Sequence, residues 1–335
     1  MTCMYSEVMD QRTTLAQTMD QFLPALDGIM RLISDKPLFL IGTGASYNAC
    51  AASKHAFAMH KGKIPQILYA AEALGYPDSL FSGAAAIVVS QSGQSHETKL
   101  LCEKLKNTSA VLIAVTADEA SVLARSAHAV IPIRVGNEVS SATKTYTATV
   151  LMLYMLACGK APYDLLQEDV ALTLRLLDDR MEELFPWLEA AGHGYVAGIG
   201  SLSASAAQAA LMLKEKCFLC YEGMSVNELR HGTIETVEKG TPIIMMSTGE
   251  EGCKEAALHA RFLCKIGAKV LFIHDSGQPL DVPRATCVKI RCNAPPEFAH
   301  IAHAMLPQLL AERFAREKGY AVDSFRYITK VVGEY

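Results

Sequence analysis

The sequence lacks the excess of basic residues that is typical of nucleic-acid-binding proteins. Its 335 residues contain 31 Lys and Arg against 35 Asp and Glu, for a formal net charge of −4. A chain with this balance has no broad electrostatic attraction for nucleic acid. We therefore expect no nucleic-acid partner, and any phosphate that the protein binds must be held by a local set of donors.

Long apolar runs are also missing. No stretch of about 18 apolar residues occurs, as a membrane-spanning helix would need, and the first ten residues, MTCMYSEVMD, contain acids and no apolar core, unlike a signal peptide. We therefore expect a cytoplasmic protein with no membrane contact.

Metal-binding cysteine patterns are absent as well. Among ten cysteines only Cys217 and Cys220 have the CxxC spacing, and no second Cys or His pair completes a zinc pattern. We place this pair in the later half of a helix, away from the helix N-terminus where a thiolate is activated, and expect it to serve packing. No metal and no cofactor are expected.

The sequence does contain enough hydrophobic residues to form a sizeable core. Half of the residues are hydrophobic, which excludes a disordered chain, and the length fits two domains of roughly 150 residues each. Short apolar runs alternate with segments of helical periodicity, which predicts parallel sheets covered by helices on both faces. The expected fold class is α/β, with two tandem doubly wound domains. The predicted strands are 37–41, 84–89, 111–115, 129–133, 195–198, 243–246, 270–274 and 286–290.

An internal repeat supports the tandem arrangement. Gly42-Thr43-Gly44 follows the first predicted strand, and Gly198-Ile199-Gly200 stands 156 residues later in the same context. A helix is predicted over 5–34, and Gly159 to Asp164 with Pro162 is the natural break. The expected boundaries are an N-terminal helical segment 1–35, a first domain 36–160, a helical linker 161–192, a second domain 193–319 and a tail 320–335.

Two loops that follow strands of the first half are rich in hydroxyl groups. Residues 42–46 contain Thr43 and Ser46, and residues 90–95 read Ser-Gln-Ser-Gly-Gln-Ser. In parallel sheets, ligands bind where the carboxyl ends of strands lead into helices. The loops match neither GxGxxG nor the Walker pattern, which disfavours a dinucleotide site. We expect a phosphate held by hydroxyls and backbone amides.

Several blocks carry a resemblance to a known family. Gly44-Ala45-Ser46-Tyr47-Asn48 and Ser90-Gln91-Ser92-Gly93 resemble the phosphosugar loops of the sugar isomerase (SIS) domain family, and four further blocks follow in the family's order. These are 138–144, 213–215, 227–232 and 323–326 with Lys330. More specifically, the chain resembles the double-SIS branch that includes the isomerase half of glucosamine-6-phosphate synthase. The resemblance implies flavodoxin-like domains, a homodimer with shared active sites and a small sugar phosphate as substrate. No cysteine-led glutaminase domain precedes the blocks, so glutamine-dependent synthesis is not expected.

The resemblance also assigns roles to residues. Glu215 matches the base that moves a proton between C1 and C2, and an apolar helix around a carboxylate favours such a role. His231 matches the ring-opening histidine, and Lys330 matches a tail lysine that can form a Schiff base with the sugar carbonyl, so the tail contributes to the site. Ser46, Ser90, Gln91, Ser92 and Ser95 match phosphate-holding positions, and Gly44, Ser140, Glu222, Glu228 and Arg326 match supporting positions.

The blocks leave the reaction open. Gln208, Met212, Ala142 and Thr233 depart from the synthase pattern near the sugar's amino end. Residues 231–242 and the tail resemble deglycases of 6-phosphorylated Amadori compounds, whereas 138–147 resembles the deaminase and synthase branch. We expect a deglycase that releases an amine or amino acid and a hexose 6-phosphate. A glucosamine-6-phosphate deaminase or an aldose–ketose isomerase is the alternative within the family.

A non-catalytic sugar-phosphate sensor is the alternative from another class. SIS domains also serve as ligand-binding modules in regulators, which usually carry a DNA-binding helix-turn-helix. The first 36 residues are too short and insufficiently basic for a typical one.

Overall fold

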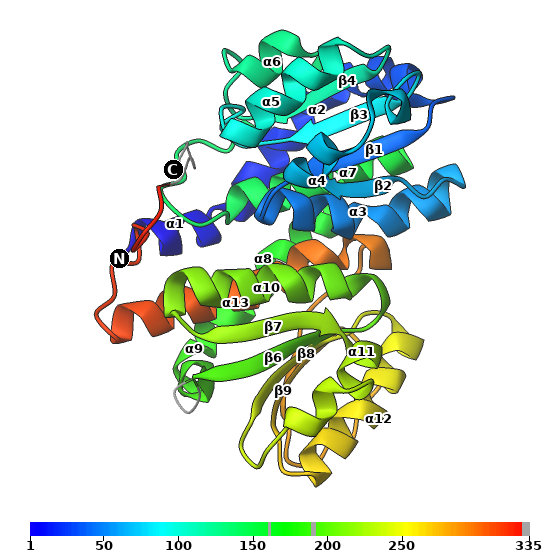
Figure 1. Ribbon diagram of the computed structural model, residues 1–335. Helices are drawn as coiled ribbons and strands as arrows, with labels where there is room; N and C mark the ends of the chain where they lie inside the picture. Colours follow the sequence, from blue (N-terminus) through cyan, green and yellow to red (C-terminus); the bar gives the residue numbers. More distant parts are fainter. Residues whose placement is uncertain (160–161, 189–191, 330–335) are drawn as a thin grey trace. The chain divides into compact units, whose positions relative to one another are not determined.

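The structure is a computed structural model that describes residues 1–159, 162–188 and 192–329. The chain divides into two compact units (Figure 1). The N-terminal unit consists of Asp10–Ala161 with Ser324–Tyr335, and the C-terminal unit consists of Met1–Met9 with Pro162–Asp323. Each unit therefore takes one terminal segment from the opposite end of the chain.

The N-terminal unit is built on a five-stranded parallel sheet with the strand order β2-β1-β3-β4-β5. The strands are β1 (Leu38–Gly42), β2 (Gln66–Tyr69), β3 (Ala85–Val89), β4 (Val111–Thr116) and β5 (Ala129–Pro132). The helices are α2 (Gln11–Ile33), α3 (Ala45–Lys61), α4 (Ala70–Gly75), α5 (His96–Lys106), α6 (Val122–Ser126) and α7 (Lys144–Cys158), with a 3₁₀ turn at Asp78–Leu80.

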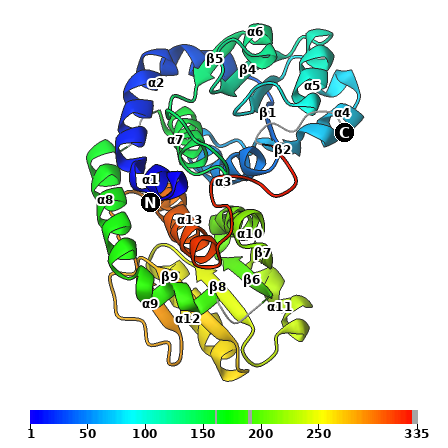
Figure 2. The ribbon, with the colours of Figure 1, turned by 90° about the vertical axis from the view of Figure 1, so that its left-hand side faces the viewer.

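Helices cover both faces of this sheet (Figure 2). On one face, Phe39 and Ile41 of β1 pack with residues of α4, α5 and α6 in a cluster that includes Phe81 and Leu101. On the other face, α3 packs on β1 and against α7, which in turn packs on α2. Burial on both faces explains why the central strands read as unbroken apolar runs in the sequence.

The C-terminal unit repeats the plan with the strand order β10-β9-β8-β6-β7, again all parallel. Its strands are β6 (His193–Gly198), β7 (Cys220–Ser225), β8 (Pro242–Met246), β9 (Lys269–His274) and β10 (Thr286–Lys289). Its helices are α1 (Cys3–Met9), α8 (Tyr163–Asp179), α9 (Met181–Leu184), α10 (Ser203–Cys217), α11 (Val226–Arg230), α12 (Glu250–Lys265) and α13 (Ala299–Glu317). Short 3₁₀ turns lie at Phe185–Leu188, Gly200–Leu202, Thr233–Thr236 and Pro296–Phe298.

Both sheets follow one order when the strands of each unit are counted along the chain: second, first, third, fourth, fifth. This is the flavodoxin-like doubly wound arrangement. In the C-terminal unit α10 packs on β6 and β7 and α13 packs on α10, while α11 and α12 join the core cluster of the opposite face (Figure 1). The predicted fold class, two tandem doubly wound parallel-sheet domains, is confirmed.

The predicted helix over 5–34 is two helices that meet at Asp10. The first, α1, packs on α13 of the C-terminal unit, where Thr2 Oγ1 donates a hydrogen bond of 2.8 Å to Glu312 Oε1. The second, α2, packs on α7 of the N-terminal unit. The two helices bury their apolar residues against different units, and helical periodicity alone carries no sign of that change of partner.

Two of the four edge strands, β2 and β7, were not predicted, because exposed positions interrupt their apolar pattern. Half-exposed strands carry polar residues and do not appear as apolar runs. The placement of Cys220 inside a helix is therefore wrong: α10 ends at Cys217, Phe218 adopts a left-handed φ of 56°, and Cys220 opens β7. The CxxC pair thus spans a helix end and a strand start.

The segment 161–192, predicted as a helical linker, contains the helices α8 and α9 and a 3₁₀ turn that continues to Leu188. Residues 189–191 lie outside the described residues. Among the described residues, no helix is both long and apolar enough to cross a membrane.

Gly198 provides a test of this packing. A Cβ at Gly198 would lie 2.2 Å from the Leu202 backbone oxygen and 2.6 Å from the Ser203 nitrogen. We expect Gly198→Ala to lower the free energy of unfolding by about 2–3 kcal/mol, because neither backbone can move aside freely. Urea denaturation of the full chain measures this loss. Gly192→Ala is the control, because nothing lies within 4 Å of its Cβ position, and it should change stability by less than about 0.5 kcal/mol.

Candidate functional site

The strand order of the N-terminal unit changes direction between β1 and β3. From β1 the chain passes through α3 to β2 on one side, and from β3 it passes through α5 to β4 on the other side. The loops after two neighbouring strands therefore diverge at the carboxyl edge of the sheet, which is where open α/β sheets bind ligands. These two loops are the hydroxyl-rich segments of the sequence: the loop 43–46 follows β1, and the loop 90–95 follows β3.

The first loop, 43–46, depends on two glycines. A Cβ at Gly42 would lie 2.7 Å from the backbone carbon of Ser46, so only glycine lets β1 run this close to the start of α3. Gly44 has φ 57° and ψ −126°, and its carbonyl accepts the first helical hydrogen bond, 3.0 Å from Asn48 N. Ser46, in the first turn of α3, is half-buried. The loop thus delivers backbone N–H groups and a hydroxyl to the carboxyl edge.

The second loop, 90–95, turns sharply at Gly93, which has φ 58°. The Gly93 nitrogen donates to the Ser90 carbonyl at 3.1 Å and to Ser90 Oγ at 3.2 Å. Ser92 Oγ accepts from Gln94 N at 3.2 Å, and Ser95 Oγ lies 2.6 Å from Thr98 Oγ1. Serine hydroxyls that accept in this way keep their own hydrogens for a ligand.

The side-chain donors of both loops are neutral and accessible. Ser46, Ser90, Gln91, Ser92 and Ser95 are all half-buried, and neither loop contains Lys or Arg. Within the described chain, no hydrogen bond engages the Ser46 hydroxyl or the Gln91 side chain. Hydroxyls and amides at a helix N-terminus suit a dianionic phosphate. The structure brings these five predicted residues to one edge of one sheet.

The C-terminal unit fills the equivalent place with its own carboxylate. The loop after β8 leads into α12, and there the Asp275 carboxylate accepts from Gly249 N at 2.8 Å and from Thr248 Oγ1 at 2.5 Å. Burial raises the pKa of the Cys253 thiol to about 11, so this thiol stays protonated and donates to Asp275 at 3.4 Å. An internal anion therefore caps the helix that an external anion would otherwise reach.

The acid at the matching place in the N-terminal unit accepts no hydrogen bond from the backbone at the start of α5 among the described residues. Asp118 follows β4 as Asp275 follows β9, but its carboxylate accepts from Ala120 N at 2.8 Å within its own turn. Its other oxygen lies 3.4 Å from Gln94 Nε2. The start of α5 is not capped by this acid, and the two repeats differ in this way at equivalent positions.

A tyrosine pair beside the first loop was missed by the sequence reasoning. The rings of Tyr47 in α3 and Tyr69 at the end of β2 stack with centroids 3.7 Å apart and planes 9° apart. Burial, followed by the contact with Tyr69, raises the pKa of Tyr47. Recognition of β2 in the sequence would have placed Tyr69 at the same edge of the sheet as Tyr47.

Glu215 lies in the C-terminal unit, near the end of α10. Its side chain is half-buried, in a helix whose buried residues include Ala206, Ala210 and Leu213. Its two lysine neighbours differ: Lys214 is exposed, whereas Lys216 is buried and donates a 3.0 Å hydrogen bond from Nζ to the Val322 carbonyl.

His231, Glu222 and Glu228 also belong to the C-terminal unit and are exposed. His231 terminates α11, and its backbone N–H donates to the Glu228 carbonyl at 3.0 Å. Glu222 lies on the edge strand β7. The catalytic and supporting roles of these residues stay predictions.

Ser140 lies in the loop that follows β5, and a buried carboxylate orders this loop. Glu138 Oε1 accepts from the backbone nitrogens of Thr143 and Thr145 at 2.9 Å each, and Glu138 Oε2 accepts from Thr145 Oγ1 at 2.6 Å. Ser140 and Ser141 are both buried, and the Ser141 hydroxyl has no hydrogen-bond partner among the described residues. The acid thus holds the start of α7 and the strand-to-helix loop together.

The tail is anchored where it leaves the C-terminal unit. Asp323 accepts from the backbone nitrogens of Cys3 at 2.9 Å and Met4 at 3.0 Å, and the preceding Val322 carbonyl is held by Lys216. Arg326 is exposed, with its guanidinium 5.8 Å from the centre of the Tyr327 ring. Lys330 lies outside the described residues.

Two copies of a known domain account for most of the chain. The SIS domain matches twice, over residues 31–158 and 188–315, and the chain therefore belongs to the SIS domain family. The glutamine–fructose-6-phosphate aminotransferase of Pyrobaculum aerophilum is 28% identical over 353 aligned positions, which cover 98% of this chain and 57% of that protein. The chain spans about half the length of the curated relatives that it matches.

Solved structures share the double-SIS fold. The C-terminal domain of glucosamine-fructose-6-phosphate aminotransferase from Francisella tularensis superposes with a TM-score of 0.84 at 20% identity, over 96% of this chain and 98% of that chain. Glucosamine-6-phosphate deaminase from Thermotoga maritima gives a TM-score of 0.82 at 22% identity, over 99% and 100%. The predicted membership of a double-SIS family is confirmed.

Gly93 tests the role of the second loop. A Cβ there would lie 2.3 Å from Ser121 Oγ and 2.9 Å from Thr116 Oγ1, in addition to the strain of a positive φ. We expect Gly93→Ala to weaken binding of glucose 6-phosphate by about tenfold or more, because the loop must shift. Isothermal titration calorimetry measures the dissociation constant.

Gly83→Ala is the matched control, because Gly83 has φ 73° but open space around its Cβ position. It carries the same type of backbone strain, about 1–2 kcal/mol, and should bind the sugar phosphate normally. Equal loss of binding in both variants would mean that strain, and not the shape of the second loop, governs binding.

Proposed function

We propose that the protein is a sugar-phosphate enzyme that acts on the carbon–nitrogen centre of a 6-phosphorylated Amadori compound or amino sugar. The observation that carries this proposal is the pair of neutral, hydroxyl-rich loops at the carboxyl edge of the sheet, after β1 and β3, which suits the phosphate of a small sugar. The names of the relatives agree with the substrate class, since they act on fructose 6-phosphate or glucosamine 6-phosphate.

The chemistry needs only proton transfers and water. In an Amadori compound, a base removes a proton from C1, between the amine nitrogen and the C2 carbonyl, and an enolamine forms. Protonation at C2 gives an imine at C1, and water then releases the amine and a hexose 6-phosphate. Each step is redox-neutral, and each general acid–base step contributes roughly 10²–10⁴-fold.

Three residues carry the proposed roles. Glu215 is the base at C1 and C2, and its half-buried position on α10 limits competing water. His231 passes a proton to or from the ring oxygen, since an imidazole can serve as general acid or general base. Lys330 reaches the carbonyl carbon of the sugar. The hydrogen bonds to Val322 and Asp323 fix the point from which the tail that carries Lys330 begins.

A deaminase that converts glucosamine 6-phosphate to fructose 6-phosphate and ammonia is the second candidate. There the same base transfers the proton from C2 to C1, and the imine at C2 is hydrolysed. The similarity to a solved glucosamine-6-phosphate deaminase favours keeping this candidate, while the resemblance of residues 231–242 and of the tail favours the deglycase. Operation as a dimer with shared sites is part of the proposal, since His231 is exposed on the single chain.

One set of assays separates the candidates. The protein is incubated with fructoselysine 6-phosphate, fructosamine 6-phosphate and glucosamine 6-phosphate, and free amino acid, ammonia, glucose 6-phosphate and fructose 6-phosphate are measured. A deglycase should give lysine with glucose 6-phosphate from the first substrate, and a deaminase should give ammonia with fructose 6-phosphate from the third. Sugar-phosphate binding without turnover of any substrate would support the sensor and refute the enzyme.

Glu215→Gln tests the proposed base. The amide preserves size but accepts no proton, so kcat should fall by about 10³-fold or more while the affinity for glucose 6-phosphate changes by less than about threefold. Lys214→Gln, an exposed neighbour on the same helix, should retain kcat within about twofold. If Glu215→Gln stays active, Glu215 has no part in the reaction.

A further inference from the structure

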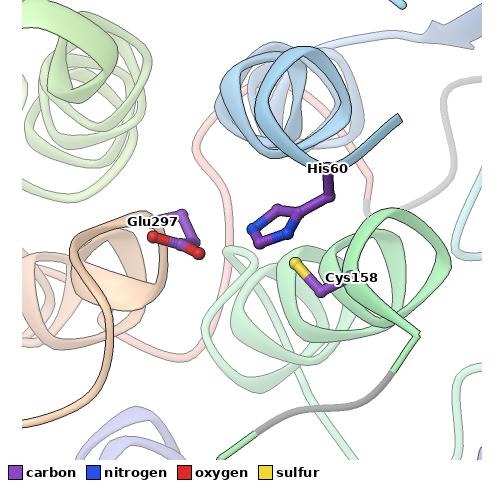
Figure 3. Close-up of side chains that lie close together, drawn as sticks. All are labelled: His60, Cys158 and Glu297. Carbon is purple, nitrogen blue, oxygen red and sulfur yellow. The ribbon is translucent and has the colours of Figure 1, made fainter. Parts of the chain in front are cut away.

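A cavity of about 350 Å³ lies in the N-terminal unit, away from the candidate site. It opens among the carboxyl ends of α2, α3 and α7 and the start of β1, and its apolar wall consists of Met30, Ile33, Leu38, Phe57 and Leu156. Two of these helix ends lie close together. In Figure 3, His60 of α3 and Cys158 of α7 point toward each other, and the His60 ring nitrogen and the Cys158 sulfur lie within 4.8 Å. Glu297, also drawn there, belongs to the C-terminal unit.

The His60 and Cys158 pair does not by itself make a metal centre, since zinc sites in proteins use three or four protein ligands. The cavity beside these helix ends is the stronger feature. Its volume lies within the range of small-molecule sites, about 300–1,000 Å³, and its mainly apolar wall is the usual lining of such sites.

The rim of the cavity is cationic although the chain as a whole is acidic. Arg31, Lys36, Lys61 and Lys63 line it, and Asp27 is the single acid among the lining residues. Within the part of the chain that the structure describes, no carboxylate forms an ion pair with any of the four cations. Lys63 instead donates from Nζ to the Ser34 carbonyl. Several uncompensated cations around one opening favour an anionic head group.

This cavity and the phosphate loops lie at opposite ends of the same strand. Leu38, at the amino end of β1, lines the cavity, and Gly42, at the carboxyl end, leads into the first loop. Five residues of strand span about 15 Å. A ligand in the cavity therefore does not overlap with a phosphate at the loops.

We propose that this cavity binds an amphipathic anion, with an apolar body the size of a naphthalene ring or a medium-length acyl chain and a carboxylate or phosphate head. The body packs on Phe57, Leu156 and Met30, and the head meets the cations of the rim. The site is distinct from the sugar-phosphate site and does not depend on which reaction the protein catalyses.

Fluorescence titration of the full chain with anilinonaphthalene sulfonate tests the proposal. The dye should bind with a saturable rise in emission, and both decanoate and decyl phosphate should displace it. Displacement by only one of them would identify the head group. Decanol, which has no charge, should displace it at least about tenfold less well, because it leaves the rim cations unpaired. Glucose 6-phosphate should not displace it.

Variants locate the dye. Lys61→Glu/Lys63→Glu should weaken dye binding by about tenfold or more, and Met30→Trp, which fills the cavity with the charges intact, should weaken it to a similar degree. Lys54→Glu/Lys99→Glu is the control for net charge, because both lysines are exposed in the same unit and neither lines the cavity. Near-ultraviolet circular dichroism confirms that each variant is folded.

Three results would overturn the proposal: no saturable dye binding, equal binding in the Lys61/Lys63 variant and its charge control, or displacement by glucose 6-phosphate. The first means that the cavity takes no such ligand, the second places the dye elsewhere, and the third places it at the phosphate loops. None of these results bears on turnover of the sugar substrates.

Discussion

The close approach of β1 to α3, and of β6 to the helix that follows it, is the contact on which both units depend. Gly42 and Gly198 occupy equivalent positions, and at each a single added carbon would collide with backbone atoms of the next turn. Because the helix starts directly against the strand, its free N–H groups face the carboxyl edge of the sheet. The parallel strand order then brings a second loop, after the third strand, to the same edge. Position and polarity of the candidate site follow from this geometry.

The two repeats share one strand order but differ in the polar groups at the carboxyl edge of the sheet. In the N-terminal unit the loops carry hydroxyls and an amide, and the nearby acid Asp118 serves its own turn. In the C-terminal unit the Asp275 carboxylate accepts from Gly249 and Thr248 and occupies the start of α12. A carboxylate there repels an incoming phosphate by charge and also occupies the Gly249 amide and the Thr248 hydroxyl as donors. The two repeats thus differ at this edge: the C-terminal copy is capped by its own carboxylate, and the N-terminal copy presents hydroxyls and amides.

Much of the fold and part of the candidate site could be predicted from the sequence. Central strands such as β3 and β8 are buried on both sides and appear as apolar runs, and the glycine turns mark where they end. The edge strands β2 and β7 could not be predicted in this way, because solvent on one side permits residues such as Glu222. The stack of Tyr47 on Tyr69 and the hydrogen bond from Lys216 to Val322 join residues distant in sequence, and no local pattern encodes such pairs. The serines of the second loop were predictable because strand, turn and helix start are contiguous there.

The distribution of the terminal segments has a consequence for how the protein can be divided. The first nine residues pack with the unit formed by the second half of the chain, and the segment from Ser324 groups with the unit formed by the first half. A cut in the connection between the halves would therefore not separate two whole domains. The first fragment would carry α1 without the α13 surface on which it packs, and the second would carry the segment from Ser324 without the unit with which it groups. Each half of the chain contains a terminal segment that belongs to the other unit, so neither half contains a complete unit on its own.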